Sequence, residues 1–169
     1  MAKYRIIRKM DIADGPGVRV SIFFQGCPFH CKNCFNKETW SFDEGKVFTK
    51  EDIDHILDLA KEDYYRGLSI LGGESLHPDN IDGATLLAKT FKEKYKDSKD
   101  IWLWTGYSFE EIKDKEIIKY LDYVVDGRYV DELHDFRLLY RGSKNQRIID
   151  VQKSIKKNNI VILNEQDIK

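Results

Sequence analysis

Cysteine is scarce in this chain of 169 residues: there are three, and all of them lie between residues 27 and 34. An odd number of closely spaced cysteines does not form the disulfide framework that stabilises small secreted proteins. The sequence also lacks long apolar runs and an apolar signal segment near its first residue. We therefore expect a cytoplasmic protein with reduced thiols, no secretory leader and no membrane span.

Charge of one sign is not in excess, because 28 basic and 29 acidic residues give a formal net charge of -1. A chain without positive charge overall lacks the general attraction for nucleic acid, so we expect no such partner. Locally the balance differs: from Arg137 to Lys157, seven basic residues stand against Asp150 alone, a balance of +6. This basic stretch is interpreted either as a solvated face or as a docking site for an acidic protein. A flavodoxin-like electron donor is the candidate for that protein.

The pattern along the chain alternates short β-rich runs with amphipathic helices, with no internal repeat or linker. The length is that of a single domain, residues 1–169. Helices are expected from a capping box at residues 49–52, over about 82–95, and from residue 108. Strands are expected at 18–25, 68–71, 101–105, 123–126, 148–151 and 160–163.

Strand, glycine and helix follow one another repeatedly, which indicates an α/β fold with a mostly parallel sheet. A closed eight-fold barrel usually needs about 250 residues. The chain is well short of that, so we expect an incomplete, laterally open (β/α) barrel. An open side suits a large substrate, such as a loop of another protein.

Four of the expected strand ends carry residues suited to chemistry: the cysteine loop, Gly72-Gly73-Glu74, Thr105-Gly106 and Asp126-Gly127. In parallel α/β sheets, sites gather at the carboxyl ends of the strands. We therefore expect these four segments to meet at one site.

The three cysteines, Cys27, Cys31 and Cys34, have the spacing C-x3-C-x2-C. Three thiolates can hold three irons of a four-iron cluster, and the fourth iron then stays open for chemistry. A zinc ion is the main alternative, with His30 or a distant histidine as fourth ligand. Zinc ligands usually come as two separated pairs, and the sequence has no second pair, so the spacing favours a catalytic [4Fe-4S] cluster.

The second motif, Gly72-Gly73-Glu74, directly follows an expected strand. Paired glycines let the backbone approach a ligand closely, and the Glu74 carboxylate could accept a hydrogen bond from a ligand ammonium group. The alternative is an ordinary tight turn between a strand and a helix.

Together these motifs resemble the radical S-adenosylmethionine superfamily. The stretch DGPGVR at 14–19, running into FFQGC at 23–27, is similar to the activases of glycyl radical enzymes. The stretches WTGY at 104–107, VDGR at 125–128 and RGSKNQR at 141–147 resemble those activases that act on anaerobic ribonucleoside-triphosphate reductase. The resemblance covers nearly the whole chain.

The resemblance implies that Cys27, Cys31 and Cys34 ligate a [4Fe-4S] cluster whose open iron chelates S-adenosyl-L-methionine. One electron would cleave the sulfonium, and the resulting 5′-deoxyadenosyl radical would remove hydrogen from a glycine of the reductase. No catalytic side chain beyond the cluster is implied. The methionine end of the cofactor is expected on Gly72, Gly73 and Glu74.

Near the adenine, many members of the superfamily place an aromatic residue before the third cysteine. Here that residue is Asn33, so a polar contact from Asn33, or a contact from the neighbouring Phe35, is expected instead. Three other readings remain: an activase of another glycyl radical enzyme such as pyruvate formate-lyase, a small radical enzyme acting on a deazapurine precursor, and a structural zinc-binding interaction module.

Overall fold

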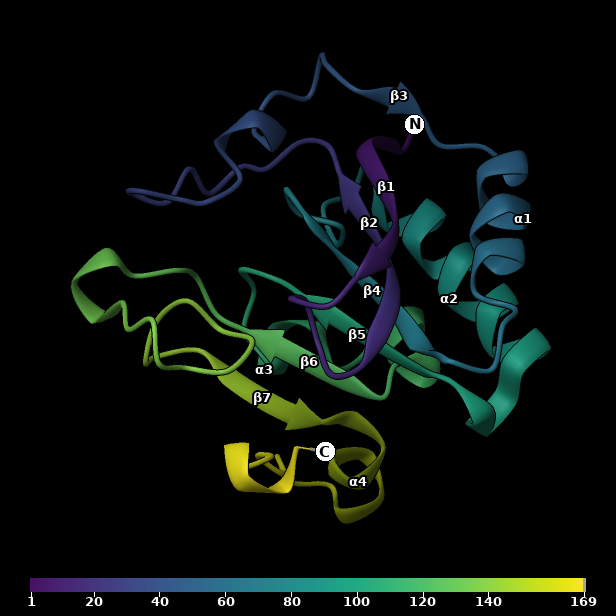
Figure 1. Cartoon of the computed structure of the whole chain (residues 1–169). Helices are drawn as coiled ribbons and strands as arrows, with labels where there is room; N and C mark the ends of the chain where they lie inside the picture. The colour runs from purple at the N-terminus through teal and green to yellow at the C-terminus, as the bar shows by residue number, and fades with distance from the viewer. Residues whose placement is uncertain (169) are drawn as a thin grey trace.

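The fold is built on one seven-stranded sheet, seen in a computed structural model that describes residues 1–168. The strand order is β3-β1-β2-β4-β5-β6-β7 (Figure 1). The strands are β1 (Lys3–Asp11), β2 (Val18–Phe24), β3 (Lys46–Val47), β4 (Tyr65–Gly72), β5 (Asp100–Trp104), β6 (Tyr123–Asp126) and β7 (Arg147–Asp150). The α-helices are α1 (Lys50–Leu59), α2 (Ile81–Tyr95), α3 (Phe109–Ile112) and α4 (Val151–Lys157).

The sheet is mixed. The pairs β2–β4, β4–β5 and β5–β6 are parallel, whereas β1–β2, β1–β3 and β6–β7 are antiparallel. The expected α/β class is confirmed, and the sheet is open, because β3 and β7 end it without pairing with each other. The expectation of a mostly parallel sheet is not confirmed, since the outer strands on both sides run antiparallel to their neighbours.

The sequence missed the strands β1 and β3, and one of the strands that it predicted does not form. β1 was not expected, because only Tyr4 and Asp11 of its nine residues are buried and the strand shows no apolar alternation. Residues 160–163 do not form a strand; this segment contributes an isolated bridge between Ile162 and Ile149 of β7. The strands β2, β5, β6 and β7 lie within a residue of where the sequence predicts them, and β4 is longer.

Helices α1 and α3 begin where their caps predict. The Thr49 side chain accepts the Asp52 backbone N–H, and the Asp52 carboxylate accepts the Thr49 N–H, which confirms the capping box of α1. A second box, between Ser108 and Glu111, starts α3. These reciprocal bonds satisfy donors that the first helical turn leaves open.

The helices cover one face of the sheet and the candidate site lies on the other. Alternate residues of β2, β4 and β5 point into the helix-covered core, among them Ile22, Ile70 and Leu103, all fully buried. The opposite face carries a smaller apolar cluster around Trp102. No helix within residues 1–168 is long and apolar enough to cross a bilayer.

The turn between β1 and β2 is held in place by a buried arginine at the start of β2. The buried guanidinium of Arg19 donates to the Pro16 carbonyl, the Ser69 hydroxyl and the Asp100 carboxylate. A Cβ at Gly15, whose φ is +104°, would lie 2.9 Å from Nε of Arg19. The positive φ and this close packing therefore require a glycine at position 15, and the DGPG stretch serves as a structural turn.

Candidate functional site

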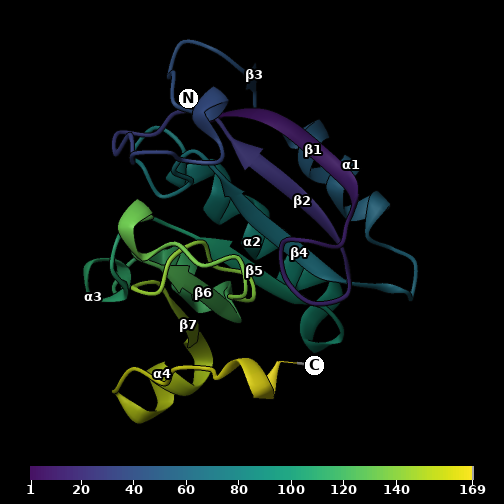
Figure 2. The same cartoon turned by 60° about the vertical axis from the view of Figure 1, so that its left-hand side comes forward.

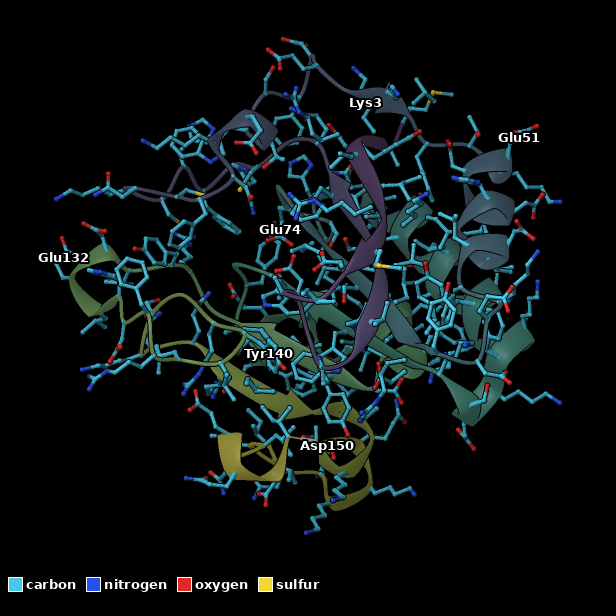
Figure 3. The ribbon with its side chains drawn as sticks, in the orientation of Figure 1. Lys3, Glu51, Glu74, Glu132, Tyr140 and Asp150 are labelled. Carbon is cyan, nitrogen blue, oxygen red and sulfur yellow. The ribbon has the colours of Figure 1, made fainter. Side chains whose placement is uncertain are left out.

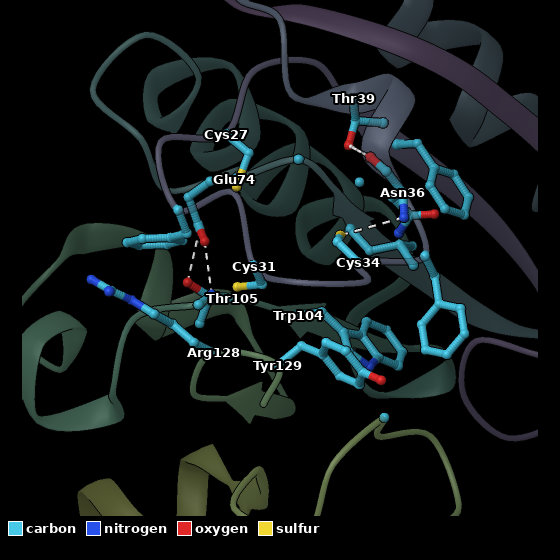
Figure 4. Close-up of a pocket in the computed structure, with 18 of the residues that line it drawn as sticks. Cys27, Cys31, Cys34, Asn36, Thr39, Glu74, Trp104, Thr105, Arg128 and Tyr129 are labelled. Carbon is cyan, nitrogen blue, oxygen red and sulfur yellow. Dashed lines mark hydrogen bonds between the residues drawn. The ribbon is translucent and has the colours of Figure 1, made fainter. Parts of the chain in front are cut away.

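A cavity of about 480 Å³ lies where the carboxyl ends of β2, β4, β5 and β6 meet. Its walls include all three cysteines and the Gly72-Gly73-Glu74 turn, together with Thr105, Gly106 and Gly127 from the next two strand ends. Figure 4 shows these side chains around one space. The four strand ends expected to meet therefore do meet, and the volume is typical of a small-molecule site.

The loop that carries the cysteines is held to the segment that follows it. The Gly26 N–H donates to the Thr39 carbonyl at 2.7 Å, and the Cys27 N–H donates to the Trp40 carbonyl at 3.1 Å. The Gln25 side-chain amide donates to two further carbonyls of this segment. The segment lines the cavity through residues 36, 39 and 40, a contribution that the sequence did not predict because its residues show no metal or ligand spacing.

The three thiols are partly buried and unbonded to one another. Burial raises the pKa of the Cys27 thiol to about 11 and also raises that of Cys31, where the nearby Arg128 charge partly offsets it. The Cys34 sulfur accepts the Asn36 backbone N–H at 3.4 Å. Without a metal, the Cys27 and Cys31 thiols therefore hold their protons at neutral pH, and metal binding has to release them.

The donor set fits an iron–sulfur cluster better than a single ion. Nowhere in residues 1–168 do three His, Cys, Asp or Glu side chains converge closely enough to hold one metal ion. A zinc ion needs its thiolates at about 2.3 Å from a single point. A four-iron cluster instead takes each thiolate on a separate iron, so more widely spaced thiols around a cavity remain suitable ligands.

The paired glycines approach protein backbone. A Cβ at Gly73 would lie 2.5 Å from the Gly26 carbonyl oxygen and 2.7 Å from that of Thr39. Gly72 has a φ of +118°, and a Cβ there would meet the backbone of Phe24 at 2.4 Å. Both glycines are thus required for the turn to pack against the base of the cysteine loop, while still lining the cavity.

Glu74 is 1% exposed and lies deep in the molecule (Figure 3). One oxygen of its carboxylate accepts the Thr105 hydroxyl at 2.8 Å and the Leu76 N–H at 3.1 Å, and the other accepts the Gly106 N–H at 2.8 Å. Burial raises the pKa of this carboxyl to about 7, against the lowering effect of these donors. Glu74 therefore joins two strand ends, a role that the sequence did not predict.

Asn80 is a further residue that the sequence did not single out. Its buried side-chain amide donates to the Gln25 carbonyl at 2.9 Å and to the Glu74 carbonyl at 3.1 Å, and its oxygen accepts the Lys3 N–H at 3.2 Å. One side chain thus fixes the start of the cysteine loop against the Gly-Gly-Glu turn. An asparagine before a helix is common enough as a cap that nothing in the pattern marked it.

Residues 128–146 form a long connection between β6 and β7, here called the arm, which runs beside the cysteine loop (Figure 1). The Asn33 side-chain amide donates to the Asp131 carboxylate at 2.9 Å. The rings of Phe35 and Tyr129 lie 5.5 Å apart. Phe35 lines the cavity and Asn33 does not, so the structure brings only one of these two predicted adenine contacts to the site.

The arm also brings a cation to the cavity. The Arg128 guanidinium stacks over the Phe29 ring at 4.3 Å from its centre. Within residues 1–168, no carboxylate lies within 4.0 Å of it. A cavity lined by three thiols and this guanidinium has the chemistry to take a metal–sulfur group together with an anionic group.

The basic stretch predicted between Arg137 and Lys157 is divided by the fold. Its arginines form ion pairs: Arg137 with Asp135, Arg141 with Glu165, and Arg147 with Asp126 and Glu110.

The lysines of this stretch in α4 lie elsewhere, because β7 runs antiparallel to β6. Asp150, which precedes α4, pairs with Tyr123 at the first residue of β6. Figures 1 and 2 both show α4 at the end of the molecule away from the cysteine loop. The stretch is therefore not one continuous basic surface, and its α4 lysines are not beside the thiols.

Comparison with known proteins gives the class of the protein. Residues 13–149 match the family described as "4Fe-4S single cluster domain". This match covers most of the chain, which places it among proteins with a single four-iron cluster domain and agrees with three thiols around one cavity.

Relatives narrow the class further. A protein of Enterobacteria phage T4 is 39% identical over 145 residues, which cover 86% of this chain and 92% of the relative. Proteins of Vibrio cholerae and Escherichia coli K12 are 41% and 36% identical, over 82% and 81% of this chain and 92% and 91% of their own lengths. Each is named anaerobic ribonucleoside-triphosphate reductase-activating protein. The chain belongs to this family of activating proteins.

Proposed function

We propose that this protein activates an anaerobic ribonucleoside-triphosphate reductase by generating a glycyl radical on it. The observation that carries the proposal is the cavity in which Cys27, Cys31 and Cys34 face the Gly-Gly-Glu turn. When bound, a [4Fe-4S] cluster would supply the electron that cleaves S-adenosyl-L-methionine, and the 5′-deoxyadenosyl radical so formed would take hydrogen from a glycine of the reductase.

The residues of this chain have binding and positioning roles in that reaction. The three cysteines hold the cluster, and Gly72, Gly73 and Phe35 line the space for the cofactor. Glu74 lines the same space: three protein donors hold its carboxylate and so fix the Thr105–Gly106 turn, and its remaining acceptor site takes the cofactor ammonium. The sheet being open, the cavity is accessible to a glycine carried by another protein.

Anaerobic reconstitution with iron and sulfide tests the metal site. The wild-type protein should bind four irons and four sulfides and give the electron paramagnetic resonance signal of a reduced [4Fe-4S] cluster. Ala replacement of any one cysteine should abolish this, because the chain has no other thiol. A zinc-loaded protein without bound iron would instead support the structural zinc module.

The activase reaction is tested with the reductase itself. Reduced protein, S-adenosyl-L-methionine and reductase, incubated without oxygen, should give a glycyl radical doublet on the reductase. Pyruvate formate-lyase, incubated in parallel, should give none. A doublet on pyruvate formate-lyase alone would transfer the proposal to that other activase. Dithionite replaces the low-potential donor, for which a flavodoxin-like protein remains the candidate.

A further inference from the structure

β1 leaves most of one edge open. β3 pairs only with Lys3 and Tyr4, so residues 5–11 have a partner strand on the β2 side alone. Figure 2 shows β1 as the outermost long strand of the sheet. An unpaired edge presents backbone N–H and C=O groups that another extended chain can bind.

The side chains along this edge are both apolar and basic. Ile6 is 45% exposed, Met10 58%, and Ile12, just beyond the strand, 75%. The basic side chains are Arg5, Arg8 and Lys9. Acidic side chains neutralise these positive charges only weakly. Arg5 and Arg8 each lie 4.0 Å from a carboxylate oxygen, and Lys9 forms no ion pair within residues 1–168.

The open edge is continuous with the candidate site. The Arg8 guanidinium lies 4.5 Å from the centre of the Phe23 ring, and both residues line the cavity that holds the three thiols. Asp14, from the turn after β1, lines it too. A chain laid along β1 would therefore lie beside the cavity.

We propose that the free edge of β1 binds an extended segment of the reductase by backbone pairing, and that this segment carries acidic and apolar side chains. The inference rests on the proposed function for the identity of the partner. The three basic residues select negative charge, and the exposed Ile6 and Met10 select apolar side chains on the same segment.

A second copy of this chain does not suit the edge. Two β1 strands paired antiparallel about Ile7 would place Arg5 opposite Lys9 twice, and pairing about Arg8 would place two arginines opposite each other. Like charges directly opposite are destabilising. The two register shifts within β1 further hinder flat self-pairing.

Hydrogen exchange of the cluster-loaded protein, with and without full-length reductase under anaerobic conditions, tests the backbone contact. Those amides of residues 5–11 that point to the open edge should exchange at least about tenfold more slowly in the complex, whereas the amides bonded to β2 are protected in both states. Protection confined to the arm or to the helix-covered face would overturn the proposal. So would protection of β1 that rises with protein concentration in the absence of reductase, which would assign the edge to self-association.

A charge-reversal pair tests the side-chain contact. The double variant Arg5→Glu/Lys9→Glu should bind the reductase about tenfold or more weakly at low salt, and the difference should shrink at high salt. The matched control is Lys89→Glu/Lys94→Glu on the exposed side of α2, which should stay within about twofold of wild type. Equal losses in both variants would overturn the proposal.

The same samples separate the two claims. Dithionite-driven cleavage of S-adenosyl-L-methionine by the β1 variant should equal that of wild type. If wild-type protein cleaves no cofactor, the proposed function fails and this inference fails with it. If it cleaves cofactor and forms the glycyl radical while residues 5–11 stay unprotected in the complex, only the β1 inference is overturned.

Discussion

Replacing Asn80 with alanine tests whether one side chain holds the cysteine loop and the Gly-Gly-Glu turn together. Asn80 is 1% exposed and makes three hydrogen bonds, to the carbonyls of Gln25 and Glu74 and from the N–H of Lys3. The substitution removes all three bonds. Asn80 contacts no thiol in any of them, so the effect measures the support of the site.

The expected loss in the free energy of unfolding depends on which hydrogen bonds each partner of Asn80 keeps after the substitution. The Gln25 carbonyl has no other donor within residues 1–168, and a buried acceptor left unpaired costs about 1–3 kcal/mol. The Glu74 carbonyl keeps a bond from the His77 N–H at 3.3 Å, and the half-buried Lys3 N–H can reach water, so each of these two losses costs about 1 kcal/mol. The sum is about 3–5 kcal/mol, a large share of the roughly 5–15 kcal/mol that stabilises a domain.

Urea unfolding of the metal-free protein under argon, followed by circular dichroism, measures this cost. The Asn80→Ala midpoint should fall by on the order of 2 M, given a typical slope of about 2 kcal/mol per molar urea. The matched control is Asn145→Ala, because exposed Asn145 makes a single bond, to the Arg128 carbonyl at 2.8 Å. The control should lose at most about 1 kcal/mol. If Asn80→Ala loses no more than the control, Asn80 does not hold the site together.

Three further predictions concern neighbouring residues. Gly73→Ala should reduce iron binding on reconstitution, because its Cβ would press on the carbonyls of Gly26 and Thr39 at 2.5 and 2.7 Å; full iron content would contradict this. Burial raises the Glu74 pKa from 4.5 to about 7, so the folded state holds this proton more tightly than the unfolded state. The stability that this proton contributes to the folded state should be complete below pH 4.5. It should fall by about 3 kcal/mol as the pH rises from 4.5 through 7. The difference in unfolding free energy between wild type and Glu74→Gln, measured at several pH values, should fall in the same way. A difference that does not change with pH would refute the raised pKa of Glu74. Asn33→Ala should speed amide exchange in the arm while costing under about 1 kcal/mol, since its bond to Asp131 is exposed; unchanged exchange would show that the bond does not hold the arm.

The parts of the fold that the sequence predicted depend on local patterns. The capping box at Thr49 predicts the start of α1, and the apolar run of β6 predicts that strand, each from a few neighbouring residues. β1 could not be recognised, because an edge strand with two buried residues has no apolar alternation. The mixed sheet was equally hidden, since strand direction at the edges depends on pairings between distant residues.

The candidate site shows the same division. The cysteine spacing and the glycines at strand ends located the cavity, because those residue types are unusual and close in sequence. The contacts that shape the cavity join residues far apart, such as Asn80 with Gln25 and Glu74 with Thr105. Asn33 was assigned to the adenine from its position before the third cysteine, and its bond to Asp131, 98 residues away, had no local pattern to reveal it.

The arm borders the cysteine loop in the fold but follows it by many residues in the sequence, so it is synthesised later. A nascent chain that has left the ribosome only as far as residue 127 already carries all three cysteines, but it lacks Arg128, Tyr129 and the rest of the arm that borders them. During synthesis at about 5–20 residues per second, the thiols therefore wait for several seconds in an unfinished cavity. The wall that the arm contributes is therefore the last part of the cavity to be synthesised.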